Sequence, residues 1–201
     1  MNRHIEKWKK KSSFGKVTDF LFLAFIIAMI IPQSRMEIGG FINGLKAKVM
    51  QPSVIESAEL TRLSEADYEW QLKDVNDKIV NFSDAKGKVI FVNFWATWCP
   101  PCVGEMPEIQ DLYAQFKDNP NVAFYMVSNE TSAKIKQFVT DREFTFPVYA
   151  QASAAPAIMP YQSIPTTFII AKDGSIVVHE VGAAHWGSEK TISIINELIA
   201  K

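Results

Sequence analysis

The chain has few cysteines and histidines, with two of the former and three of the latter among 201 residues. Small secreted proteins that rely on a disulfide framework carry many cysteines at long spacings, so this class is excluded. Cys99 and Cys102 stand close together, and a bridge between them closes too small a ring to stabilise the fold much. Their spacing predicts redox chemistry or half of a metal site.

Net charge is also small, at −1, and nothing overall indicates a nucleic-acid partner. That balance hides an asymmetry. Residues 1–16 hold six Lys and Arg against one Glu, a charge of +5 that leaves about −6 (−1 minus +5) for the rest. The sequence has no internal repeat, and its length suffices for one domain with extensions.

An apolar run occupies most of residues 17–35, and twelve of its residues follow one another without a break. Basic residues before such a run stay on the cytoplasmic side, which places the following chain outside. We therefore predict a basic cytoplasmic segment over 1–16, a single transmembrane signal anchor over 17–35 and a tether over 36–66. The run is shorter than the usual span of about 20 residues, so Lys16 and Arg35 would have to reach the interfaces with their long side chains.

Two other interpretations of this run remain open. A cleaved signal peptide needs small residues in an A-x-A-like site, and residues 32–38 offer no good one. A buried core helix would not explain the basic flank. The anchor interpretation locates the protein in the cytoplasmic membrane, with residues 67–201 on the periplasmic or extracytoplasmic side.

Residues 67–201 show the pattern of one α/β domain. Apolar runs predict strands at 68–72, 78–82, 88–95, 122–127, 166–171 and 175–181, and helical spacing predicts helices at 100–116, 132–141 and 188–200. The run at 88–95 is apolar throughout, as in a strand buried on both faces of a parallel sheet. The order predicts a mixed central sheet with helices on both faces, preceded by an N-terminal β-hairpin.

Cys99 falls where a predicted strand ends and a predicted helix begins, and Pro100 suits the first helical turn. The start of a helix carries about half a positive charge, which favours a thiolate. We therefore predict that Cys99 is the accessible nucleophile and that Cys102, one turn on and more buried, resolves the mixed disulfide. Pro100 and Pro101 carry no charge and no N–H group, which favours a reducing protein over an oxidant.

Metal binding is the weaker interpretation of this pair. A zinc site takes four ligands, and the pair supplies two. The other candidates are His179, His185 and His4, the last on the far side of the predicted membrane. A copper-handling module using Cys99, Cys102 and His185, an inert structural bridge and a binding domain with a vestigial motif are further alternatives. We expect no metal and no cofactor beyond the Cys99–Cys102 disulfide.

Residues 91–102, FVNFWATWCPPC, resemble the active site of the thioredoxin superfamily, and VGEMPE at 103–108 resembles its TlpA/ResA-like branch of membrane-anchored thiol-disulfide oxidoreductases. The similarity covers roughly residues 68–200 and includes IPTTF at 164–168. It implies a thioredoxin-like fold and protein-disulfide reductase activity on protein thiols and disulfides. A disulfide oxidase or isomerase of the same fold remains the alternative.

The resemblance also implies roles for residues around the cysteines. Pro165 matches the family's cis-proline, whose loop offers backbone groups to an extended substrate peptide. Gly182 matches a third loop, where glycine permits close approach. Trp98 is expected to be a partly exposed contact surface, and Trp95 a core residue. The residues expected to contact substrate are Trp98, Pro100, Pro101, Ile164, Pro165 and Gly182.

Glu105, one turn after Cys102, matches a Glu that branch members place beneath the active site. There it would relay the proton of the buried cysteine, and burial would raise its pKa toward the working range. Many thioredoxins have an Asp in the preceding strand instead, where this chain has Asn93, which does not titrate. A solvated helix residue is the alternative for Glu105, and Glu108 is expected to be solvated.

A reductase in an oxidising compartment needs a supply of electrons, and the chain has no further cysteine to provide it. The resemblance implies a membrane thiol carrier of the DsbD/CcdA type as donor. It also implies clients in cytochrome c maturation or envelope thiol homeostasis. Residues 150–162 are expected to border the cleft and to set specificity, and the protein is expected to be a monomer.

Overall fold

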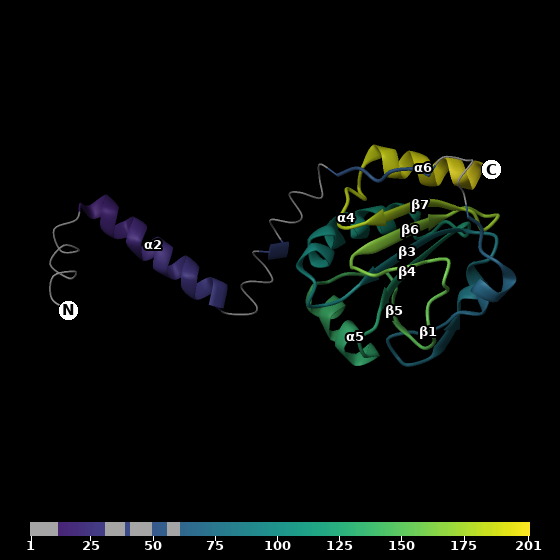
Figure 1. Ribbon diagram of the computed structural model, residues 1–201, viewed down its shortest axis with the longest axis horizontal. Coiled ribbons are helices and arrows are strands. Elements are labelled where there is room, and N and C mark those ends of the chain that lie inside the picture. Colours follow the sequence, from purple (N-terminus) through teal and green to yellow (C-terminus); the bar gives the residue numbers. More distant parts are fainter. Residues whose placement is uncertain (1–11, 31–38, 41–49, 56–60) are drawn as a thin grey trace. The chain divides into compact units, whose positions relative to one another are not determined.

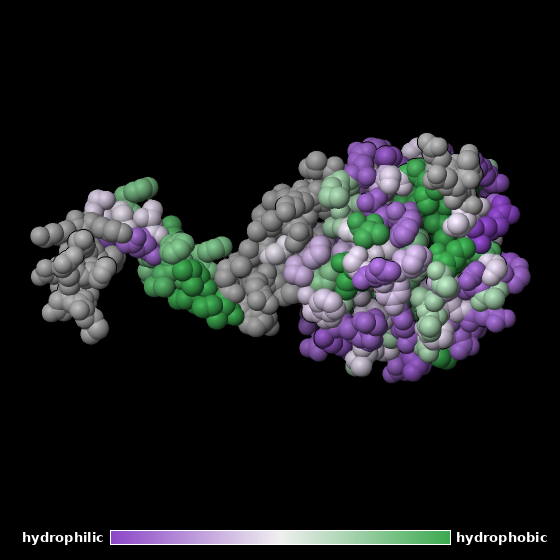
Figure 2. All heavy atoms as spheres, in the orientation of Figure 1, coloured by the Kyte–Doolittle hydropathy of each residue, from purple (hydrophilic) through white to green (hydrophobic). Residues whose placement is uncertain are grey.

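A computed structural model describes residues 12–30, 39–40, 50–55 and 61–201, which form two compact units, 1–38 and 39–201 (Figure 1). In the first unit α2 spans Ser13–Ile30. Its apolar side chains are exposed, and Figure 2 shows an apolar surface along most of its length. Within the described ranges, no helix combines the length and the apolar character that crossing a membrane takes. Residues 1–11 and 31–35 of the predicted basic segment and anchor lie outside the described residues.

A seven-stranded mixed sheet forms the centre of the second unit, in the order β2-β1-β5-β4-β3-β6-β7. Its strands are β1 (Gln71–Lys73), β2 (Ile79–Asn81), β3 (Val89–Trp95), β4 (Val122–Ser128), β5 (Val148–Gln151), β6 (Thr166–Ile170) and β7 (Ile176–Val181). The helices are α4 (Pro100–Phe116), α5 (Ser132–Asp141), α6 (Glu189–Ala200) and the 3-10 helices η2 (Glu65–Glu69) and η3 (Phe82–Ala85). The strands β3, β4 and β5 are parallel to one another, and the other neighbours are antiparallel.

The strand β3 is buried along its whole length, as its continuous apolar run predicts. Its side chains alternate between two hydrophobic clusters. Phe91 and Trp95 face one cluster, and Val92 and Phe94 face the other. Burial on both faces fixes the register of β3, because a slip of one residue would exchange the two sets. Trp95, only 2% exposed, is the core residue that the sequence predicts.

The α-helices of this unit pack on one face of the sheet. Met106 of α4, Ile135 of α5 and Ile195 of α6 belong to the cluster that contains Phe91. The chain passes from β3 to β4 to β5 in one direction, and right-handed crossovers then place α4 and α5 on the same face. The opposite face is covered by η2, η3 and residues 152–165. We predicted helices on both faces of the sheet. One face carries the three α-helices, and of the described helices the opposite face carries only the 3-10 helices η2 and η3.

Both predicted hairpins are present, but the sequence did not predict β5. The pair β1–β2 is antiparallel, as is the pair β6–β7. Because β1 also pairs with β5, the first hairpin extends the central sheet and does not stand before it as a separate element. The four residues of β5 alternate between buried and half-buried side chains, too short a pattern to identify a strand beside Pro147.

The described residues of segment 36–66 include two that pair with the sheet edge. Val54 forms an antiparallel bridge with Val178 of β7, and Arg62 forms one with Ser175 just before it. An uncovered edge strand offers unpaired backbone groups to other chains. These bridges therefore occupy part of the β7 edge with the protein's own chain.

Candidate active site

Cys99 and Cys102 form a disulfide where β3 leads into α4. Cys99 is the N-cap residue of α4, and its Sγ accepts a hydrogen bond from the Cys102 backbone N–H at 3.3 Å. Pro100 and Pro101 open the helix, where a missing N–H group costs no hydrogen bond. The predicted strand-to-helix junction is confirmed. The Cys99 sulfur lies at the positive end of the helix, where a thiolate is stabilised once the disulfide is reduced.

The disulfide is more enclosed than the sequence suggested. Cys99 is 3% exposed and Cys102 1% exposed, and both belong to the cluster that packs under the α-helices. Cys99 is therefore less accessible in the disulfide form than we expected. Trp98, immediately before it, is 59% exposed and presents the flat apolar surface that was predicted for this position.

Two loops remote in sequence lie beside the disulfide. The Ile164–Pro165 peptide bond is cis, as predicted, and the Ile164 carbonyl oxygen lies 3.7 Å from the Cys99 Sγ. Gly182, with φ of 100°, donates its N–H to the Pro165 carbonyl at 2.8 Å. The fold thus brings together the cysteine pair, the cis-proline loop and the loop that contains Gly182.

Glu105 is completely buried beneath the start of α4, which excludes the solvated alternative. Its Oε2 accepts hydrogen bonds from Trp186 Nε1 at 2.9 Å and from the Ala184 N–H at 3.2 Å. Its Oε1 accepts one from Asn93 Nδ2 at 2.8 Å. Burial raises the pKa of Glu105 to about 8, although these three donors act in the opposite direction. A carboxyl group that titrates near neutral pH therefore lies one helical turn from Cys102.

The prediction that Glu108 is solvated is wrong. Its side chain is only 12% exposed, and its Oε2 lies 2.7 Å from Nδ1 of His185. The loop after β7 folds over this part of α4, with Gly187 against Glu108, and brings the imidazole to the carboxylate. His185, the third ligand of the copper hypothesis, thus contacts Glu108. Within the described part of the chain, no group of three or more His, Cys, Asp or Glu side chains could hold a metal ion.

Glu130, which the sequence did not single out, holds the loop that precedes Cys99. Its carboxylate accepts hydrogen bonds from the Thr97 N–H at 2.6 Å and the Thr97 hydroxyl at 2.9 Å, and it contacts Lys134 Nζ at 2.5 Å. Burial raises the pKa of Glu130, but these hydrogen bonds outweigh burial and hold the pKa below its ordinary value. The sequence did contain a signal for this contact. Glu130 comes just after β4, and β4 ends at the same edge of the sheet as β3, which leads to Cys99.

A small cavity of about 30 Å³ borders the cis-proline loop. Gln151 and Tyr161, which are hydrogen-bonded to each other at 2.6 Å, line it together with Trp95 and Ile164. Both ends of the segment 150–162 thus lie near the site, which agrees with its predicted place at the cleft.

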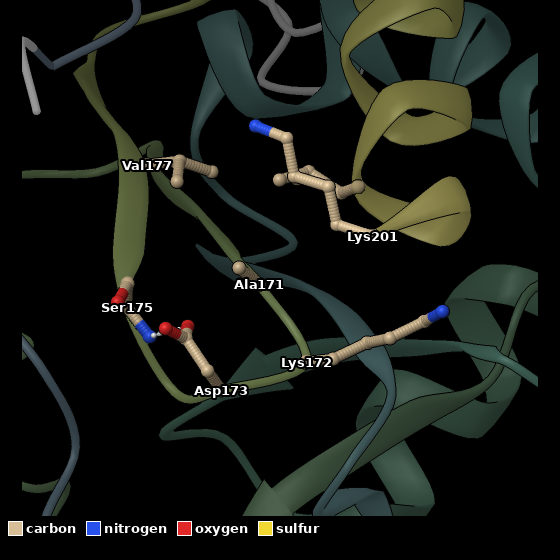
Figure 3. A pocket seen from close by; sticks show the side chains of 7 residues that line it. Ala171, Lys172, Asp173, Ser175, Val177 and Lys201 are labelled. Atoms are coloured by element: carbon tan, nitrogen blue, oxygen red, sulfur yellow. Dashed lines mark hydrogen bonds between the residues drawn. The ribbon is translucent and has the colours of Figure 1, made fainter.

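A larger pocket of about 290 Å³ lies between the β6–β7 hairpin and the end of α6 (Figure 3). Lys172 and Asp173 of the hairpin turn and Lys201 of the chain end are among its lining residues. None of the residues that line it belongs to the disulfide site or to the loops around it. This pocket is therefore separate from the candidate active site.

A helix-capping disulfide, a cis-proline loop beside it and a buried carboxyl group one turn along the helix place the chain in the class of thioredoxin-like proteins with a redox-active cysteine pair. The comparison with protein families agrees with this class. The AhpC/TSA family matches residues 65–179, and the chain belongs to this family.

Individual relatives are similar to part of this chain. Thiol-disulfide oxidoreductase ResA of Oceanobacillus iheyensis is 33% identical over 123 residues, which cover 59% of this chain and 64% of the relative. The chain thus spans less than two thirds of that relative's length. ResA of Halalkalibacterium halodurans is 30% identical over 141 residues, or 68% of this chain and 78% of the relative.

Solved structures show the same fold. A crystal structure described as a thiol:disulfide interchange protein DsbE from Chlorobium tepidum aligns with a TM-score of 0.56 at 23% identity. The alignment covers 65% of this chain and 92% of that one. At this identity the likeness supports the thioredoxin-like fold alone.

Proposed function

We propose that this protein reduces disulfides in other proteins outside the cytoplasm, by dithiol-disulfide exchange through Cys99 and Cys102. The observation that carries the proposal is the Cys99–Cys102 disulfide at the start of α4, with the Ile164 carbonyl beside its first sulfur. The ResA relatives, named thiol-disulfide oxidoreductases, support the same reaction class.

The exchange takes two steps that balance in electrons and protons. The reduced Cys99 thiolate attacks one sulfur of a substrate disulfide, forms a mixed disulfide and expels one substrate thiolate. Cys102 loses its proton and attacks the Cys99 sulfur, which expels the second substrate thiolate and closes the Cys99–Cys102 bridge. The substrate gains two electrons and this protein loses them.

Glu105 is the group that we assign to the proton of Cys102. It lies three residues after Cys102 on the same helix and is enclosed with it in the core. Its pKa of about 8 lies near the ordinary value of about 8.5 for a cysteine thiol, so a proton passes between the two groups at little cost. An exposed Glu of ordinary pKa would be a much poorer acceptor.

The substrate surface that we propose follows from the arrangement of the loops. Trp98 offers an exposed aromatic face, and Ile164 borders the disulfide with backbone groups that can pair with an extended peptide. Pro165, the next residue, is buried, and its carbonyl accepts a hydrogen bond from the Gly182 N–H, which holds this loop in place. Pro100, Pro101 and Gly182 complete the rim. The chemistry fits a protein segment around a cystine, without a cofactor.

The direction of exchange is part of the proposal. Pro100 and Pro101 place no charge and no N–H group next to the Cys99 sulfur, which favours a reducing poise. The two cysteines are the only ones in the chain, so electrons must come from a separate donor, for which a DsbD/CcdA-type membrane thiol carrier is suitable. Clients in cytochrome c maturation or envelope thiol homeostasis fit this chemistry. A redox titration against glutathione checks the direction, and a potential near −120 mV, like that of DsbA, would indicate an oxidase or isomerase.

We also propose that the chain is anchored in the cytoplasmic membrane through residues 17–35. The support is the exposed apolar surface of α2 and the basic residues within 1–16 that precede it. Membrane fractionation followed by protease treatment of spheroplasts tests this placement. We expect the untreated protein to sediment with the membrane fraction. In intact spheroplasts, we expect the added protease to digest residues 39–201 from outside. Recovery of the intact chain in the soluble fraction would contradict the anchor.

Trapping of mixed disulfides tests the proposed reaction. In Cys102→Ser the resolving thiol is missing, so client proteins should remain bound to Cys99 and should be released by dithiothreitol. The matched control is Cys99→Ser, which keeps the same number of thiols but lacks the proposed nucleophile, and it should retain none. Equal capture by both variants, or by neither, would refute the assignment.

A further inference from the structure

Asn93 connects Glu105 to the neighbouring strand through one end of its amide. It lies in β3 and is 1% exposed. Its Nδ2 donates hydrogen bonds to Glu105 Oε1 and to Thr167 Oγ1, both at 2.8 Å. Thr167 stands directly opposite Asn93 in the β3–β6 pairing. The other end of the amide, Oδ1, is buried and has no hydrogen-bond partner among the described residues.

The hydrogen-bond donors around Glu105 stabilise its ionised form but not its protonated form. The Trp186 indole and the Ala184 backbone amide are N–H groups that can donate but not accept, so they stabilise the ionised carboxylate. Once Glu105 is protonated, its O–H becomes a donor that needs an acceptor, because a buried donor without a partner is costly. With Asn93 Nδ2 facing Glu105, none of the three partners, Trp186, Ala184 and Asn93, offers an acceptor for this O–H.

An amide side chain can supply that acceptor without any change in packing. Its oxygen and nitrogen ends have nearly the same size, so a half-turn about the last side-chain bond exchanges them in place. The hydroxyl of Thr167 can both accept and donate, so it fits either orientation. Each orientation gives Asn93 two hydrogen bonds and leaves its other end without a partner. The state of Glu105 is therefore what decides between them.

We propose that the Asn93 amide turns end for end as Glu105 gains or loses its proton, donating to the carboxylate in one state and accepting from the carboxylic acid in the other. Asn93 is then a positioning residue that serves both forms of Glu105. This inference deepens the proposed function, because it rests on Glu105 exchanging the Cys102 proton. It can nevertheless be examined in the disulfide form, in which neither cysteine titrates.

The charged groups near Glu105 determine how the titration must be controlled. Glu108, one turn further along α4, is the charged group that acts on Glu105, and it contacts His185 of the loop after β7. Asn93 and Thr167 on the sheet side do not titrate. His185→Asn therefore identifies any transition that comes from the Glu108–His185 pair, and the Glu105 transition should persist in this variant.

Two variants separate a turning amide from a fixed one. Trp186→Phe removes a group that only donates, so it should raise the pKa of Glu105, by about one unit, or tenfold in the proton affinity. Asn93→Leu removes a donor from the ionised state and an acceptor from the protonated state, so the two losses oppose each other. We expect the shift in Asn93→Leu to be less than half of that in Trp186→Phe. A fixed amide predicts similar upward shifts in both.

The direct test is side-chain NMR on the full-length oxidised chain in detergent micelles, with ¹⁵N-labelled Asn and ¹³C-labelled Glu, across the titration of Glu105. At high pH the Asn93 amide protons should show contacts to the Thr167 methyl group. These contacts should be lost at low pH with the midpoint of the Glu105 carboxyl signal, and Trp186→Phe should move both midpoints upward together.

The inference is overturned if the contact between the Asn93 amide protons and Thr167 persists through the whole titration. It is also overturned if Asn93→Leu raises the midpoint as far as Trp186→Phe does. The first readout uses the unaltered chain, so it stands even if Asn93→Leu fails to fold. Neither readout requires a client, so failure of the trapping experiment with Cys102→Ser remains a separate result.

Discussion

The Trp186 indole donates a hydrogen bond to Glu105 across 81 positions of sequence, at 2.9 Å, and so joins the loop after β7 to the helix that begins at the disulfide. The Ala184 N–H donates to the same carboxyl oxygen, and Asn93 donates to the other. Three donors around one enclosed carboxyl group explain why the group is tolerated in the core. Burial nevertheless keeps its pKa high, at about 8.

Stability should depend on pH through Glu105. Because its pKa is raised from 4.5 to about 8 in the folded state, the folded chain holds a proton that the unfolded chain has lost in this range. The stabilisation is complete below pH 4.5 and is lost as pH rises toward 8, by up to about 1.4 kcal/mol per pH unit. Urea unfolding of the oxidised protein between pH 5 and 8 should therefore show a decline that Glu105→Gln flattens. The exposed Glu197→Gln control should keep it, and an equal decline in Glu105→Gln would contradict the assignment.

Glu130 should have the opposite pH dependence. Its pKa is lowered, so its stabilisation is present above the unfolded value of 4.5 and is lost as pH falls through the folded value. At pH 7, Glu130→Gln should cost about 1–3 kcal/mol, because the amide cannot accept all the hydrogen bonds from Thr97 and Lys134. Lys134→Met leaves both Thr97 bonds in place and should cost less than half as much. Urea unfolding of both variants is the measurement, and equal losses would show that the ion pair alone matters.

The two tryptophans on either side of Ala96 and Thr97 should separate stability from substrate contact. Trp95 is 2% exposed, so Trp95→Ala should cost about 3–5 kcal/mol through the cavity it leaves. Trp98 is 59% exposed, and Trp98→Ala should change the free energy of unfolding by less than about 0.5 kcal/mol. We expect Trp98→Ala to slow the reduction of a protein disulfide several-fold while the reduction of a small aromatic disulfide stays unchanged. Equal slowing with both substrates would argue against a contact surface.

Local patterns were enough to predict the core of this site. The apolar run that forms β3, the cysteine pair at its end and the proline at the start of α4 all lie within a dozen or so residues, where periodicity and capping are informative. The cis-proline and Gly182 were predicted from resemblance and lie where expected. The junction of β3 and α4 depends little on how the remaining chain folds.

Features that depend on distant segments could not be predicted. The partners of Glu105 come from β3 and from the loop after β7, and the contact between Glu108 and His185 depends on the path of that same loop. The face of the sheet that α5 covers depends on where β5 lies and on its direction in the sheet. The four residues of β5 were too few for their pattern to predict a strand. No local spacing contains this information.

A comparison of Gly182 with Gly87 should separate a loss of stability through backbone strain from a loss of activity at the disulfide. Gly182 and Gly87 have φ of 100° and 80°, and a Cβ at either position would meet nothing within 4 Å. Replacement of either by Ala should therefore cost a similar amount, about 1 kcal/mol, from backbone strain alone. The Gly182 backbone contacts the cis-proline loop through its hydrogen bond to the Pro165 carbonyl, so strain at this position shifts the loop beside the disulfide. Gly182→Ala should therefore also slow reduction of a protein disulfide several-fold, and Gly87→Ala should not. Unfolding in urea and reductase assays on both variants give the comparison, and equal activities would leave Gly182 with a purely structural role.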